Sequence, residues 1–205
     1  ENIDIDFSSP FTFLMDMSML GVGVGGDCRG AGKVKVQEPV VGDEYIVEDT
    51  REGWVNTVRK ILDSYVGKDV LPSSINFDGV RPKGSVIKTF GGIASGPDPL
   101  RDLCTRIQNL LSTRVGEYIT STDIVDIFNM IGVCVVSGNV RRSAEIIFGD
   151  PNDEGFRGLK DPSELASIDS TITTMKASLD SLVGEDRENL EKEIEVLYAQ
   201  KQNHP

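Results

Sequence analysis

The chain alternates between stretches whose apolar residues recur every three or four positions and segments rich in glycine. The apolar stretch Phe11–Leu20 follows Ser8-Ser9-Pro10, which predicts a helix with a serine cap and a proline near its first position. Three further stretches have helical spacing; they run from about Trp54 to Tyr65, from about Leu100 to Leu111, and from Thr122 to about Cys134, the last with Ser121 or Thr122 as its cap.

Two shorter segments alternate between apolar and polar residues, as strands do. Lys33–Val36 predicts a short strand with an exposed basic face, and Ser74–Val80 predicts a second strand that ends at Arg81-Pro82. Two glycine-rich loops, Gly21–Gly32 and Gly91–Pro99, separate these elements from the helices. The chain is therefore expected to mix helices with short strands.

The last part of the chain, Pro151–Pro205, differs in composition from the rest. It holds 12 acidic and 6 basic residues. Its apolar residues recur at helical spacing in two sets separated by Gly184; they are Ile172, Met175, Leu179 and Leu182, then Leu190, Ile194 and Leu197. This pattern predicts a helical hairpin or a short antiparallel coiled coil, and we interpret it as a solvated insertion between core elements.

Composition narrows the class of protein. The chain has 205 residues and a formal net charge of −12, which argues against a nucleic-acid-binding surface because such a surface needs basic residues. No apolar run is long enough for a membrane span and no signal sequence is evident, so we expect a cytoplasmic protein without a membrane or nucleic-acid partner. Three widely spaced cysteines without a CxxC pair fit a reducing compartment. Because the sequence starts at Glu1 and stops at Pro205, we expect a fragment.

The first glycine loop matches the dinucleotide fingerprint by letter. Gly21, Gly23 and Gly26 have the required spacing, and an acidic residue follows about 20 positions later. That fingerprint needs a strand before the glycines and a helix after them, however, and here the predicted order is helix, glycines, strand. The loop is either a tight turn or a cradle for a phosphate or sugar, to which Arg29 and Lys33 would add positive charge.

Few other residues suggest catalysis. Ser95 and Gly96 precede a predicted helix and either bind an anion or cap the helix, and we favour the cap. Cys134 is expected to be a buried apolar residue, whereas Cys28, beside a basic residue, is either a thiol of lowered pKa or, as we favour, an ordinary surface thiol. The only histidine, His204, lies at the end of the sequence, so we expect no histidine-based catalytic or metal site.

The segment Val135–Ile147 carries the strongest signal. Apolar residues flank a short loop that holds Gly138, Asn139 and the adjacent Arg141 and Arg142. Paired guanidinium groups in a loop between two buried runs suit an anion or a flat polar ring. We therefore expect this loop to bind a ligand.

Four motifs occur together in one order along the chain. They are Phe11–Gly25, Asp49–Trp54 (Asp-Thr-Arg-Glu-Gly-Trp), Phe90–Pro99 (Phe-Gly-Gly-Ile-Ala-Ser-Gly-Pro-Asp-Pro) and Gly138–Glu145 (Gly-Asn-Val-Arg-Arg-Ser-Ala-Glu). Over roughly residues 7–160 this set closely resembles the adenosylcobalamin-dependent (class II) ribonucleoside-triphosphate reductases. Four motifs in order are far more specific than any one of them.

The resemblance implies an α/β fold: part of the ten-stranded α/β barrel of ribonucleotide reductases, with an α-helical hairpin insertion. Residues 1–160 would form the N-terminal part of the barrel with the allosteric specificity region, and residues 161–205 the acidic hairpin insertion. The family reduces ribonucleoside triphosphates to 2′-deoxyribonucleoside triphosphates by thiyl-radical chemistry, with adenosylcobalamin and a thioredoxin-like reductant. Cys28, Cys104 and Cys134 do not match the family's radical or reducing cysteines, which implies that the catalytic residues and the cobalamin site lie outside this chain.

Within the chain, the resemblance implies that the backbone of Gly21 lies against the substrate and that the helix Pro10–Leu20, with its glycine loop and the continuation of that loop, receives a deoxynucleoside triphosphate (dNTP) effector. The loop Gly138–Ser143 resembles the specificity loop between effector base and substrate base, where an amide can read a base edge and arginines can stack or pair with phosphate. The expected effector and specificity residues are Gly138, Asn139, Val140, Arg141, Arg142, Ser143, Arg29 and Lys33. The chain departs from the family at Gly26, usually an aromatic residue, and at Cys28, usually a hydroxyl residue.

Two interpretations from other classes remain open. The chain would be a non-catalytic nucleotide-binding regulatory module if it bound a dNTP or ATP without any attached catalytic part. It would be a structural interaction protein if it worked through its acidic helical hairpin. A reading frame that continues to the radical cysteine favours the enzyme over the regulatory module.

Overall fold

The computed structural model describes residues 6–87, 92–137, 143–159, 162–179 and 185–203. The contacts between Cα atoms divide the chain into two compact units, residues 1–150 and residues 151–205. Each unit has buried apolar side chains of its own.

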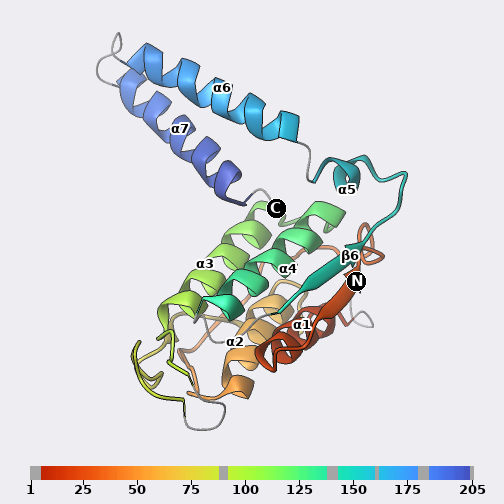
Figure 1. The fold of residues 1–205 in the computed structure, drawn as a ribbon, viewed down its shortest axis with the longest axis vertical. Helices are drawn as coiled ribbons and strands as arrows, with labels where there is room; N and C mark the ends of the chain where they lie inside the picture. Colours follow the sequence, from red (N-terminus) through yellow and green to blue (C-terminus); the bar gives the residue numbers. More distant parts are fainter. Residues whose placement is uncertain (1–5, 88–91, 138–142, 160–161, 180–184, 204–205) are drawn as a thin grey trace. The chain divides into compact units, whose positions relative to one another are not determined.

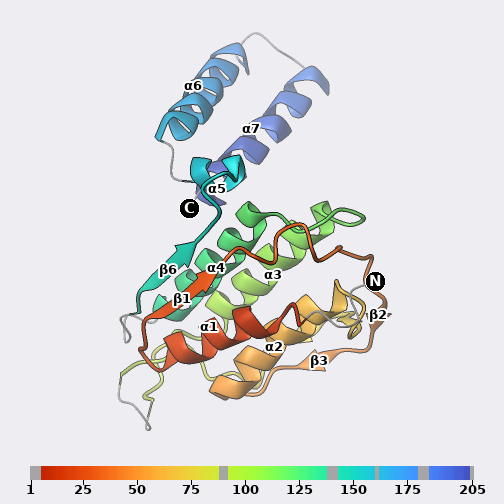
Figure 2. The ribbon, with the colours of Figure 1, turned by 90° about the vertical axis from the view of Figure 1, so that its right-hand side faces the viewer.

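Four helices form the body of the first unit. They are α1 (Ser9–Met19), α2 (Arg51–Ser64), α3 (Asp98–Thr113) and α4 (Ser121–Val136). Helix α1 packs against α2 and α4, and α3 packs against the same two helices (Figures 1 and 2). The core between them consists of fully buried aliphatic side chains, among them Leu14, Ile61, Leu62, Ile107 and Ile131. All four predicted helices are confirmed.

The spacing of apolar residues explains which side of α2 is buried. Val55, Val58, Ile61 and Leu62 recur at helical intervals and are buried, whereas Trp54 is half-buried. Burying an aliphatic side chain of this size contributes about 1.5–3 kcal/mol. This face therefore holds α2 on the helix cluster and leaves the first turn of the helix accessible.

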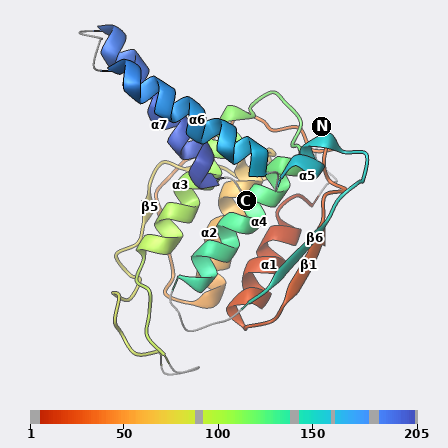
Figure 3. The same cartoon turned by 45° about the horizontal axis from the view of Figure 1, so that its top comes forward.

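Within the described residues, six short strands pair two by two, and all three pairs are parallel. They are β1 (Val24–Asp27) with β6 (Glu145–Phe148), β2 (Val41–Gly42) with β4 (Leu71–Pro72), and β3 (Tyr45–Ile46) with β5 (Ile75–Asn76). Figure 3 shows the β1–β6 pair beside α1, which contacts β1. The chain is therefore an α/β protein, as predicted. The ten-stranded barrel stays a prediction, because the described strands form only these three pairs.

The strand predicted over Lys33–Val36 is wrong, although burial alternates along it as expected. Its two valines are buried and its two lysines are exposed. The segment exchanges backbone hydrogen bonds with residues 116–119, but only Lys35 and Tyr118 form a bridge, which is isolated and antiparallel. One bridged pair of residues does not form a strand.

The strand predicted over Ser74–Val80 is reduced to β5. The backbone N–H of Asp78 donates to the side-chain oxygen of Asn76 over 2.9 Å, which forms a local turn. The N–H of Val80 then donates to the carbonyl oxygen of Phe77, also over 2.9 Å. These two turns end the extended backbone after Asn76.

The helix caps differ from those predicted. Helix α4 is capped by Thr120, not by Ser121 or Thr122, because the Thr120 hydroxyl accepts the N–H of Asp123 over 3.1 Å. The Asp123 carboxylate accepts the N–H of Thr120 over 2.9 Å in return, which completes a reciprocal capping box. Ser8 stands at the predicted cap position of α1 but makes no side-chain cap hydrogen bond.

The second unit contains three helices, α5 (Glu154–Gly158), α6 (Pro162–Leu179) and α7 (Glu185–Asn203). Helices α6 and α7 lie side by side (Figure 1) and bury Ile172 and Ile194. The predicted boundary after residue 160 and the contact boundary after residue 150 both place these helices in the second unit; that the pair is an insertion stays a prediction. The pattern of apolar residues does not predict α5, which is one short turn capped by Asp153.

None of the helices described in either unit has both the length and the apolar character needed to cross a lipid bilayer.

Candidate functional site

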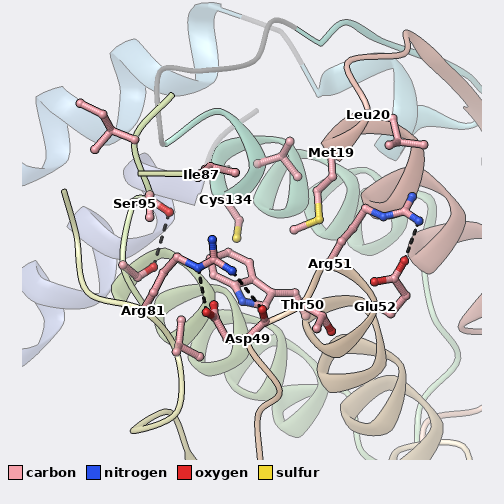
Figure 4. Close-up of a pocket in the computed structure, with 16 residues that line it drawn as sticks. Met19, Leu20, Asp49, Thr50, Arg51, Glu52, Arg81, Ile87, Ser95 and Cys134 are labelled. Carbon is pink, nitrogen blue, oxygen red and sulfur yellow. Dashed lines mark hydrogen bonds and ion pairs between the residues drawn. The ribbon is translucent and has the colours of Figure 1, made fainter. Parts of the chain in front are cut away.

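A pocket of about 490 Å³ lies in the first unit, where the ends of three helices meet (Figure 4). Its wall consists of Met19, Leu20, Asp49, Thr50, Arg51, Glu52, Trp54, Val80, Arg81, Ile87, Ile93, Ala94, Ser95, Gly96, Cys134 and Val135. These residues come from the end of α1, the beginning of α2, the end of α4 and two loop segments. Three of the four sequence motifs thus contribute to one pocket, and the fourth begins at Gly138, shortly after Val135.

A side-chain cap and close packing fix the first turn of α2. Thr50 is the N-cap, and its hydroxyl accepts the N–H of Gly53 over 2.9 Å. Gly53 is buried, and a Cβ at this position would collide with the backbone carbonyl oxygen of Glu48. Only glycine fits there. The glycine of the motif Asp49–Trp54 is therefore required by the packing of the backbone. The other residues of the motif form one side of the pocket.

An ion pair joins the beginning of α2 to the loop after β5. The Nε of Arg81 donates to a carboxylate oxygen of Asp49 over 2.7 Å, and Nη2 donates to the backbone carbonyl of Asp49 over 3.3 Å (Figure 4). The two side chains are 39% and 31% exposed. Two hydrogen bonds from one guanidinium fix its plane, so the loop is held against the helix.

Arg51 is shared by two carboxylates from different helices. Its Nη1 lies 2.8 Å from the carboxylate of Asp16 on α1, and its Nη2 donates to Glu52 over 2.7 Å. The hydrogen bond to Glu52 raises the pKa of Arg51. The backbone amide of Glu52, followed by Arg51, lowers the pKa of the Glu52 carboxyl. Arg51 and Glu52 are therefore both charged at neutral pH.

The loop before α3 forms another part of the wall. Ala94 donates its N–H to the carbonyl of Ser85 over 2.8 Å, and Val86 and Ile93 form an isolated antiparallel bridge. Gly96 has φ of +80°, which favours glycine. A Cβ at Gly96 would lie only 2.9 Å from a backbone nitrogen. Backbone geometry therefore explains this glycine.

The serine cap predicted for α3 is wrong. The N-cap of α3 is Pro97, which makes no side-chain cap hydrogen bond. The hydroxyl of Ser95 donates to the carbonyl of Gly96 over 3.4 Å and lines the pocket. A loop turn, not a helix end, determines the position of Ser95.

The three cysteines are all buried. Cys134 lines the pocket, and burial raises its pKa above the usual range, so its thiol is neutral. Burial also raises the pKa of Cys104, to about 12. The expectation of a surface thiol at Cys28 is wrong, because this side chain packs inside the unit with its sulfur 3.9 Å from the carbonyl oxygen of Ser121.

Gly21, the predicted substrate-binding residue, directly follows the pocket residue Leu20. Its φ is +81°, and its N–H donates to the carbonyl of Ser18 over 2.9 Å, so it ends α1 in a tight turn. The hydroxyl of Ser143 donates to the carbonyl of Val22 over 3.0 Å. The end of the predicted specificity loop is thereby attached to the turn at Gly21.

The other predicted site residues fall into two groups. Gly138, Asn139, Val140, Arg141 and Arg142 lie outside the described residues. Arg29 is exposed and pairs with Asp27, with Nη2 2.6 Å from the carboxylate, and Lys33 is exposed nearby in the sequence. Both follow the end of β1, and neither lines the pocket. Their role in effector binding stays a prediction.

Sequence reasoning missed the polar residues of the pocket. Asp49, Arg51 and Trp54 belong to a motif that carries the resemblance, but the sequence did not predict that they form part of a site. Arg81 follows a predicted strand and gave no functional signal at all. Only the fold brings Arg81 to Asp49, which is 32 positions away in the sequence.

The described pocket is suited to binding rather than to covalent chemistry. Its carboxylates are engaged by guanidinium groups, and its thiol is neutral. The described part of the chain contains no group of three His, Cys, Asp or Glu side chains that could hold a metal ion. A ligand with a flat ring and an anionic group would match the aromatic, aliphatic and guanidinium groups of the wall.

Comparisons with known proteins give one consistent result. Residues 31–111 match the family model described as B12-dependent ribonucleotide reductase, insertion domain. A probable adenosylcobalamin-dependent ribonucleoside-triphosphate reductase of Dictyostelium discoideum is 46% identical over 171 residues, which cover 75% of this chain and 22% of that protein. The adenosylcobalamin-dependent ribonucleoside-triphosphate reductase of Euglena gracilis is 43% identical and covers 77% of this chain and 22% of its own length.

A solved structure agrees. The crystal structure of a B12-dependent (class II) ribonucleotide reductase matches with a TM-score of 0.63 and 28% identity, over 78% of this chain and 27% of that chain. The chain therefore spans 22% of the length of the first two curated relatives. Together the matches confirm the resemblance to class II ribonucleotide reductases that the four motifs predict.

Proposed function

We propose that this chain is the effector-sensing part of a ribonucleotide reductase that reduces ribonucleoside triphosphates to 2′-deoxyribonucleoside triphosphates. The pocket between α1, α2 and α4 binds the dNTP effector, and the turn at Gly21 contributes to the substrate site. The observation that carries this proposal is the assembly of three family motifs around one pocket, next to the fourth motif.

The chemistry of the pocket supports a nucleotide ligand. A volume of about 490 Å³ lies within the range of small-molecule sites, about 300–1,000 Å³. Trp54 and the aliphatic side chains offer surface for a base, and Arg51 and Arg81 offer guanidinium groups for phosphate. The adjacent Gly21 turn would place effector and substrate close together.

The β1–β6 pair supports the predicted barrel. Ile146 and Phe148 are 57% and 61% exposed, and the pair has no third strand among the described residues. Parallel sheets are almost always covered on both faces. Further strands and helices of a complete barrel would cover these side chains.

The similarity to adenosylcobalamin-dependent reductases supports a dependence on this cofactor. The cofactor would supply the radical chemistry and a thioredoxin-like protein the electrons. The three cysteines of this chain are buried, and the pocket suits a nucleotide. We therefore place the cobalamin site and the catalytic cysteines in other parts of the enzyme.

Binding can be tested with the single tryptophan of the chain, Trp54, which lies in the pocket wall. Titration with each dNTP should change its fluorescence in a saturable manner. Arg81→Ala should weaken binding about tenfold, the effect of one lost charged hydrogen bond. Arg106→Ala, which removes an ion pair with Asp102 outside the pocket, is the matched control and should bind normally. An unchanged fluorescence signal with all four dNTPs would contradict the proposal.

The specificity loop is tested in the full-length polypeptide that carries this chain. Arg142→Ala should weaken the control that each dNTP exerts over which ribonucleoside triphosphate is reduced. The measurement is the reduction rate of the four substrates with each effector. If all four substrates keep their normal response, the role of this loop is refuted. Nucleotide binding without any reduction would favour a regulatory module instead.

A further inference from the structure

Arg51 connects the pocket to helix α1. It lies in the pocket wall, yet its Nη1 is 2.8 Å from Asp16 on α1. The side chains of Arg51 and Asp16 are 30% and 29% exposed. Asp16 itself does not line the pocket. The guanidinium is thus accessible to a ligand on one side and bound to α1 on the other.

The end of α1 continues this connection. Val22 donates its N–H to the carbonyl of Met17 over 3.1 Å, and Gly21 donates to Ser18 over 2.9 Å, so the turn is built on the last residues of the helix. Ser143 then donates its hydroxyl to the carbonyl of Val22 over 3.0 Å. A displacement at the end of α1 would therefore reach both the Gly21 turn and the end of the loop before β6.

We infer that the ion pair between Asp16 and Arg51 couples occupation of the pocket to the position of the Gly21 turn. This inference rests on the proposed function, because it takes the ligand to be a dNTP. The triphosphate competes with Asp16 for the Arg51 guanidinium, and the release of Asp16 changes the restraint on the end of α1. Asp16 and Arg51 act as positioning residues and carry no chemical step.

The chemistry of the guanidinium group allows a phosphate to compete with Asp16. Arg51 has five N–H donors in one plane; Nη2 donates to Glu52, while Nη1 forms the ion pair with Asp16. Phosphate and carboxylate groups each present two oxygens that can accept from a guanidinium, so a phosphate can replace Asp16 as the partner of Nη1. Coupling between two binding sites of this kind is typically about 5- to 150-fold in affinity.

The test measures binding alone, in the full-length polypeptide that carries this chain. Because coupling is reciprocal, it equals the ratio of the Kd for a dNTP without and with a bound ribonucleoside triphosphate. We expect at least one of the sixteen dNTP and substrate combinations to give a ratio of about five or more. In Asp16→Asn that ratio should approach one, while the dNTP alone binds as well as before or more tightly, since a competing carboxylate is lost.

The matched control is Asp69→Asn, which breaks the ion pair between Lys60 and Asp69 at the other end of α2. That pair spans 2.8 Å, is of similar exposure and lies outside the pocket, so its loss should leave the ratio unchanged. Arg51→Lys is a second variant: an ammonium keeps the charge but does not fork between two carboxylates, and the ratio should fall again. Circular dichroism shows whether each variant folds.

The outcomes are distinct. If Asp16→Asn or Arg51→Lys folds and keeps the normal Kd ratio, the coupling role of this ion pair is overturned, while the effector site stands. If the unaltered protein binds no dNTP, the proposed function fails and this inference fails with it. A fall in the ratio for Asp69→Asn as well would show a general effect of weakening α2 and would also overturn the inference.

Discussion

Glu145 begins β6 with its carboxylate against α4. The carboxylate lies so close to Gly132 that a Cβ on Gly132 would collide with it. Burial raises the pKa of Glu145 from 4.5 to about 7. The folded chain therefore holds this proton more tightly than the unfolded chain, and the free energy of unfolding falls as the pH rises from about 4.5 to 7.

Glu145→Gln should remove this pH dependence. A shift of this size corresponds to at most about 3 kcal/mol, and we expect about 1 kcal/mol because partial exposure screens the charge. The variant should match the unaltered protein at pH 5 and exceed it in stability at pH 8, as measured by urea unfolding followed through Trp54. Glu38→Gln, at an exposed position, controls for the loss of one negative charge. Equal stability differences at both pH values would refute the effect.

Single residues also show where sequence information ends. The resemblance predicts an aromatic residue at the position of Gly26. In this chain a Cβ at Gly26 would lie 2.7 Å from the ring of Phe128 on α4, so the packing leaves no room for a side chain there. Cys28 is likewise buried, with its sulfur 3.9 Å from the carbonyl oxygen of Ser121. Such contacts between distant positions leave no mark on local sequence patterns.

At the level of elements, the four helices were predictable because their apolar periodicity is local. The strands were not, because each has only two to four residues and depends on a partner distant in the sequence. The same holds for the site. The sequence indicated Gly21 and Ser143, whereas the pairing of Arg81 with Asp49 and of Arg51 with Asp16 arises only when α1, α2 and the loop after β5 pack together.

The first turn of α2 offers a test of this packing. In most helices a change from glycine to alanine stabilises, by up to about 1 kcal/mol. Gly53→Ala should instead destabilise by about 1–3 kcal/mol, because the new Cβ meets the carbonyl of Glu48. It should also weaken dNTP binding by moving Thr50 and Arg51. Thermal unfolding and the Trp54 titration measure the two effects.

The contrasting variant is Gly158→Ala in α5, where a Cβ would meet nothing within 4 Å. It should leave stability unchanged or raise it slightly. If both variants raise the melting temperature, the fit of Gly53 against Glu48 is not a constraint.

At the level of the whole molecule, the pocket belongs entirely to the first unit. Replacing residues 163–199 by a short linker should therefore leave dNTP binding intact, as measured by calorimetry. Loss of binding would show that the predicted hairpin insertion contributes to the site. Removal of the whole second unit after residue 150 tests the same prediction more strictly, and dNTP binding should again be intact.

The parallel pairing of β1 with β6 has a consequence for how the chain folds. Val24 pairs with Glu145, and the whole segment between the two strands forms one crossover connection that includes α2, α3 and α4. Closing so long a loop costs more entropy than forming contacts between helices that are neighbours in the sequence. We therefore expect the helix cluster to assemble early and the strand pair to close last. Variants in β1 or β6 would then change mainly the rate of unfolding, while variants in the helix core would slow folding.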